Sequence, residues 1–68
     1  MDIRDRLGER VQKVRESQKL SRVQLAERLG VTRMTIFNIE TGAHAVNVDT
    51  LQALAKALGV TEDRLVKP

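Results

Sequence analysis

Two nearly identical octamers constrain the fold of this chain more than any other feature. LAERLGVT occupies residues 25–32 and LAKALGVT occupies residues 54–61, and six of the eight letters match. In each copy leucine and alanine recur at helical spacing, and the glycine that follows can adopt the left-handed conformation that ends a helix. The final threonine can cap the next helix. Each octamer therefore predicts a helix end, a tight turn and a helix start, with the valine of the turn filling the core.

The rest of the chain also carries helical patterns. An apolar stripe at intervals of four, four and three residues predicts a first helix, which Asp2 or Asp5 can start. The stripe consists of Ile3, Leu7, Val11 and Val14. The expected caps of the later helices are Ser21 with Gln24, Thr32, Asn47 and Thr61, and the expected helix ends are Gly30, Thr41-Gly42 and Gly59. No alternating strand pattern or Asn-Gly or Asp-Gly turn interrupts them. The sequence predicts an all-α, compact five-helix fold in a single domain, residues 1–68.

Composition excludes several classes of function. The chain has no cysteine and one histidine, His44, so we expect no metal site, no cofactor and no enzyme, because no nucleophile–base–acid set is present. No apolar run approaches the roughly 18 residues of a membrane span, and no signal peptide pattern opens the chain. We therefore expect a cytoplasmic protein. A repeat array is excluded, because solenoids need about three or more units.

The charge distribution is uneven. Residues 1–33 hold nine Lys/Arg and five Asp/Glu, a net charge of +4, whereas residues 34–68 hold three and four, a net charge of −1. A basic half on a small domain suits an anionic partner such as nucleic acid. A solvated charged helix face is the alternative that charge alone leaves open.

The segments after the two octamers differ in chemistry. Glu62-Asp63 follow the second copy, where acids suit the positive end of the helix dipole, but Arg33-Met34 follow the first. An arginine there is unfavourable unless an anion lies close by. With Ile36 and Ile39 inward, the outward surface of this third helix is Arg33, Met34, Phe37, Asn38 and Thr41. Such groups can read guanine, adenine and thymine methyls, although Met34 and Phe37 could instead be partly buried or contact a protein.

Residues 20–42, LSRVQLAERLGVTRMTIFNIETG, resemble the helix-turn-helix of the phage repressor/Cro family, also called Xre-type. The similarity extends over nearly the whole chain. It implies a five-helix repressor-like fold, with the helix that begins at Arg33 as the recognition helix in the major groove.

The resemblance also implies roles for individual residues. Arg33, Met34 and Asn38 fall where the family reads bases. Arg22 replaces the usual phosphate-binding glutamine at the start of the second helix and should strengthen that contact. The other positions expected at DNA are Thr32, Thr35, Phe37, Thr41, His44 and Asn47.

One pair of residues is expected to support the architecture instead. Arg15 and Glu40 resemble an internal salt bridge of the family, between the first helix and the end of the recognition helix. Bidentate geometry would suit the arginine. Glu40 would then hold the orientation on which base contacts depend.

Two functions remain open. The first is a transcriptional regulator that binds double-stranded DNA as a homodimer, with half-sites about 10 base pairs apart. Its dimer contact would use the last helix, around 61–66, or form only on DNA. The alternative is a protein-interaction module: an antitoxin-like partner of a toxin, or a domain that docks on another protein through Val23, Met34 and Phe37. Salt-dependent binding to duplex DNA separates the two.

Overall fold

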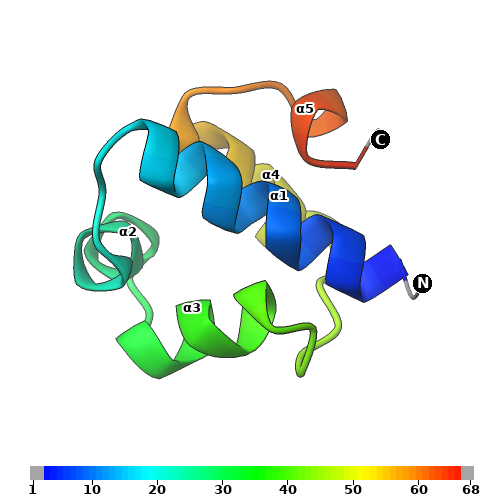
Figure 1. Ribbon diagram of the computed structural model, residues 1–68, viewed down its shortest axis with the longest axis horizontal. Helices are drawn as coiled ribbons and strands as arrows, with labels where there is room; N and C mark the ends of the chain where they lie inside the picture. The colour runs from blue at the N-terminus through cyan, green and yellow to red at the C-terminus, as the bar shows by residue number, and fades with distance from the viewer. Residues whose placement is uncertain (1–2, 67–68) are drawn as a thin grey trace.

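The computed structural model describes residues 3–66, with side chains from residue 6 onward. The expected start at Asp5 is wrong, because α1 already includes residues 3–5, and the expected start at Asp2 and the inward position of the Ile3 side chain lie outside the described parts. Five helices and no strand occur within residues 3–66, which confirms the all-α prediction. They are α1 (Ile3–Ser17), α2 (Arg22–Leu29), α3 (Arg33–Glu40), α4 (Val48–Leu58) and α5 (Glu62–Val66), arranged as in Figure 1.

The predicted caps at Ser21, Thr32 and Asn47 form as expected, and at Thr61 the backbone carbonyl accepts from the N–H of Arg64 at 3.1 Å. The Ser21 hydroxyl accepts from the backbone N–H of Gln24 at 3.0 Å, and the Gln24 side-chain oxygen accepts from the N–H of Ser21 at 2.8 Å, which completes a capping box. The Asn47 side chain accepts from the N–H of Thr50 at 2.7 Å and caps α4. Gly30 and Gly59 end α2 and α4 with φ of 74° and 68°, so both octamers make the same left-handed helix end.

The valines of the two octamers behave differently, although their backbones match. Val31 and Val60 each donate a backbone N–H to the alanine five residues earlier, at 3.0 Å. Val60 packs against the core, but Val31 is 39% exposed, so the prediction that both valines fill the core is wrong for Val31. The segment that joins α2 to α3 lies at the edge of the molecule (Figure 1), and Val31, which belongs to this segment, is therefore reached by solvent.

All five helices contribute to one core. α1 runs across the molecule and contacts α3 on one side and α5 on the other, while α4 packs against α1, α2 and α5 (Figure 1). The apolar stripe of α1 points inward as predicted, with Val11 fully buried and Leu7 and Val14 packed beside it. The buried apolar residues are Val11, Leu25, Ala26, Ile36, Ile39, Leu54, Ala55, Leu58 and Leu65.

Gly8 allows α1 to lie unusually close to the end of α3. A Cβ at Gly8 would lie 2.5 Å from the carbonyl oxygens of both Ile39 and Glu40. Backbone atoms of a packed helix cannot move aside as a flexible side chain does. Any larger residue at Gly8 would therefore push α3 away from α1.

Replacing Gly8 by alanine should lower stability. At an open helix position this change stabilises by about 0.5–1 kcal/mol, but overpacking against backbone costs about 1–3 kcal/mol. We expect a reduced midpoint of urea unfolding. Glu9→Ala, at the exposed neighbouring position, is the matched control and should change the midpoint little. A Gly8→Ala protein more stable than the wild type would contradict the close approach.

Candidate nucleic-acid interface

α3 presents a mixed polar and apolar surface to solvent. Ile36 and Ile39 are buried and fix its inner face, as the sequence predicted. On the outer face Met34 is 59% exposed and Phe37 is 43% exposed. The structure therefore brings the predicted base-reading residues to one surface: Arg33, Met34, Phe37 and Thr41 are exposed, and Thr35 and Asn38 are half-buried.

The start of α3 is favourable for an anion. Thr32 caps the helix by accepting from the N–H of Thr35 at 3.3 Å, and the two threonine hydroxyls lie 3.1 Å apart. The first turn has no acidic residue and carries Arg33. The positive end of the helix dipole and the guanidinium thus lie together at this end, where a phosphate would be stabilised.

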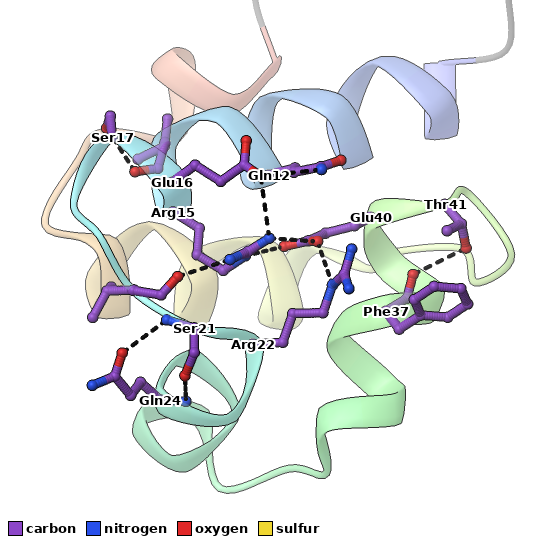
Figure 2. Close-up of polar contacts among 12 residues, drawn as sticks. Gln12, Arg15, Glu16, Ser17, Ser21, Arg22, Gln24, Phe37, Glu40 and Thr41 are labelled. Carbon is purple, nitrogen blue, oxygen red and sulfur yellow. Dashed lines mark hydrogen bonds and ion pairs between the residues drawn. The ribbon is translucent and has the colours of Figure 1, made fainter.

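The only carboxylate of α3 is withdrawn from this surface. Arg15 Nε donates to Glu40 Oε2 at 2.6 Å, and Arg15 Nη2 donates to Oε1 at 3.2 Å. Arg15 Nη1 also donates to the carbonyl of Leu20 at 2.7 Å. The side chain of Glu40 is 0% exposed and that of Arg15 is 8% exposed. This two-point ion pair confirms the predicted bridge between α1 and the end of α3 (Figure 2).

Arg22 is engaged inside the protein in a way that sequence reasoning missed. It opens α2, as expected, but its Nε donates to Glu40 Oε1 at 2.9 Å. Its guanidinium carbon lies 5.2 Å from the centroid of the Phe37 ring. No local pattern in the sequence indicates that Arg22 shares Glu40 with Arg15, because the three residues belong to three different helices.

A shallow open groove of about 470 Å³ lies between the start of α2 and α3. Two of its arginines, Arg22 and Arg33, come from the first positions of successive helices. The groove thus joins the two places where the sequence predicted contact with phosphate and with bases. Its lining residues are Arg15, Ser21, Arg22, Val23, Arg33, Met34 and Phe37.

The loop after α3 folds back on the end of that helix. The Thr41 hydroxyl donates to the carbonyl of Phe37 at 3.0 Å (Figure 2), and the N–H groups of Ala43 and His44 donate to the carbonyl of Asn38. These bonds hold the backbone of His44 at the last turn of α3, and His44 is exposed. Asn47 is also exposed, although its side-chain oxygen already caps α4.

The described residues offer no metal centre, because no three of their His, Cys, Asp and Glu side chains gather to hold an ion. Within the described part of the chain, no helix is long and apolar enough to cross a membrane.

Comparisons with known proteins match this geometry. A family model described as helix-turn-helix, HTH_3, matches residues 11–65. The control protein C.SmaI of Serratia marcescens is 39% identical over 66 residues, which cover 97% of this chain and 79% of that protein. The immunity repressor protein of Bacillus phage phi105 is 35% identical over 60 residues, or 88% of this chain, but this chain spans only 42% of that repressor.

A solved structure also matches the whole arrangement of helices. The P22 c2 repressor protein in complex with synthetic operator 9T superposes with a TM-score of 0.81 at 33% sequence identity. The match covers 90% of this chain and 92% of that repressor chain.

Removing the carboxylate of Glu40 should destabilise the fold. Glu40→Ala removes the hydrogen-bonded carboxylate of the buried Arg15 and leaves Glu16, at 4.0 Å, as its acidic partner, so we expect a cost of about 3–5 kcal/mol. Double-mutant cycles on urea unfolding should show strong coupling between Glu40 and Arg15. The coupling of Glu40 to Arg22, whose side chain is 39% exposed, should be weaker. Additive effects of Glu40→Ala and Arg15→Ala would rule out the bridge as a stabilising unit.

Proposed function

The chain belongs to the HTH_3 helix-turn-helix family, as its resemblance to phage repressors predicted, and we propose that it regulates transcription by binding specific double-stranded DNA through α3. One observation carries this proposal. The exposed face of α3 bears Arg33, Met34 and Asn38, while its sole carboxylate, Glu40, is buried against Arg15. A helix that must approach phosphates and base edges needs such a face, because an exposed carboxylate would repel the DNA backbone.

Three residues are proposed to read bases. Arg33 suits the two acceptors of guanine, and the Asn38 amide suits adenine. Met34, the most exposed apolar residue of α3, suits the methyl group of thymine. The solved operator complex of the P22 c2 repressor, which this chain resembles in fold and sequence, supports the choice of DNA as the ligand.

The surrounding residues are proposed to contact the sugar–phosphate backbone. Arg22 uses Nε for Glu40 and also lines the groove, so its two amino groups are proposed to donate to a phosphate there. Threonine and asparagine side chains and a loop histidine suit phosphate oxygens, which position a protein on DNA without reading sequence. The remaining proposed contacts of this class are Thr32, Thr35, Thr41, His44 and Asn47, and Phe37 is proposed to lie at the DNA as an apolar part of the same surface.

We further propose that two copies bind a two-fold operator. The recognition helices of such a pair must meet the same side of the duplex, so the half-sites should lie about 10 base pairs apart. The acidic start of α5, Glu62 and Asp63, lies away from the groove-lining residues and leaves this helix suitable for the contact between copies. The site of action would be the cytoplasm, where bacterial and phage operators are found.

A protein partner is the second candidate function. Val23, Met34 and Phe37 are exposed apolar residues that line one groove, and such a cluster also suits a protein such as a toxin. Binding to a protein through this cluster would depend little on salt. Binding to DNA should weaken steeply as salt rises, because neutralised phosphates release counterions.

Selection of bound sequences from a random duplex pool tests the proposed function directly. We expect enrichment of a two-fold motif with half-sites about 10 base pairs apart and affinity that falls steeply between about 50 and 200 mM salt. Enrichment of no motif, together with salt-independent capture of a protein, would favour the protein-interaction function.

Arg33→Ala should weaken specific binding by about 1–3 kcal/mol and relax the preference at one base position, which we expect to be a guanine. Competition binding with single-base operator variants measures both effects. Arg28→Ala, at an exposed arginine of α2 that donates to the carbonyl of Ala57 and does not line the groove, is the matched control. A mutant Arg33→Ala that keeps its affinity and its base preference would remove Arg33 from the set of readers.

A further inference from the structure

The Phe37 ring and the Arg22 guanidinium form a contact between α3 and α2 that the proposed base-reading role of α3 does not use. The guanidinium carbon lies 5.2 Å from the ring centroid, within the range of a cation–π interaction. Arg22 Nε is fixed on its other side by Glu40 at 2.9 Å, and Figure 2 shows the guanidinium lying between the carboxylate and the ring. Two different partners thus restrain one long side chain.

The charges of this cluster leave Arg22 suited to a further anion. The buried Glu40 carboxylate accepts from Arg15 through two nitrogens and from Arg22 through one. Arg15 also lies 4.0 Å from the Glu16 carboxylate, whereas the ion pair of Arg22 is the one to Glu40, which Arg22 shares with Arg15. Arg15 is buried, whereas the side chain of Arg22 is 39% exposed at the groove. Of the two arginines that share Glu40, Arg22 is thus the one that can offer positive charge to an anion in the groove.

We propose that Phe37 is a positioning residue: its ring holds the Arg22 guanidinium in place for a DNA phosphate, and it contributes to DNA affinity through Arg22 and not by contact with a base. This inference rests on the proposed function. An arginine side chain loses much rotamer freedom when it binds, so restraining it before binding reduces that cost. The ring face that meets the guanidinium is also withdrawn from any thymine methyl group.

The test compares Phe37→Leu, Arg22→Gln and the double variant in titrations of a selected duplex at several salt concentrations. Phe37→Leu keeps an apolar side chain but removes the ring, and should weaken binding about two- to five-fold without altering base preference. Arg22→Gln should reduce the magnitude of the salt slope by about 0.9. In the Arg22→Gln background, Phe37→Leu should have no further effect. Phe37→Trp should recover the affinity lost in Phe37→Leu, because tryptophan is the better partner for a cation.

Met34→Ala is the matched control on the same surface. Met34→Ala should alter the preference at one base, and its affinity should no longer change when thymine is replaced by deoxyuridine. Its loss of affinity should multiply with the loss caused by Arg22→Gln. Thermal melts establish that each variant is folded before binding is measured. In the free protein, the side-chain proton signals of Arg22 should carry a ring-current shift that Phe37→Leu removes.

The possible results separate this inference from the proposed function. If the losses from Phe37→Leu and Arg22→Gln multiply, or if Phe37→Leu changes base preference or the response to deoxyuridine, the positioning role is overturned while DNA binding stands. An Arg22 signal unaffected by Phe37→Leu also overturns the positioning role. A wild-type protein that binds no duplex overturns the proposed function and the role of Phe37 together.

Discussion

The buried carboxylate of Glu40 is the interaction on which the rest of the structure depends. It lies at the last position of α3 and receives Arg15 from α1 and Arg22 from α2, so one side chain connects three helices. A buried charge is costly unless it is paired and hydrogen-bonded, and this one is both. The same burial clears negative charge from the outer face of α3. Stability and the chemistry of the proposed DNA interface thus depend on one group.

A steric constraint acts at the same end of α3. Gly8 allows α1 to approach the carbonyl oxygens of Ile39 and Glu40 more closely than a side chain would permit. The ion pair fixes the direction of this helix end, and the glycine fixes its distance from α1. Together they explain how a small core of short aliphatic side chains can hold α3 in a defined orientation.

Local features of the fold were predictable because their causes are local. The capping box at Ser21, the glycine helix ends and the inward isoleucines of α3 follow from residues a few positions apart. The bridge of Arg15 to Glu40 was predictable only through family resemblance. The link from Arg22 to Glu40 and the role of Gly8 were not, because they depend on distances between helices that no sequence period encodes. The prediction that Val31 fills the core was wrong because the two octamers, although their backbones match, lie beside different parts of the molecule.

The ion pair and the close approach at Gly8 both hold the C-terminal end of α3. Glu40 lies at this C-terminal end, whereas Arg33 lies at the N-terminal end, next to the exposed turn that contains Val31. The two ends of this eight-residue helix lie roughly 10 Å apart, so a tilt of about 5° at Glu40 would move the backbone of Arg33 by about 1 Å. Hydrogen bonds to base edges tolerate little more than that. In the proposed role of α3, the accuracy of base reading by Arg33 would therefore depend on how rigidly the Glu40 end of the helix is held.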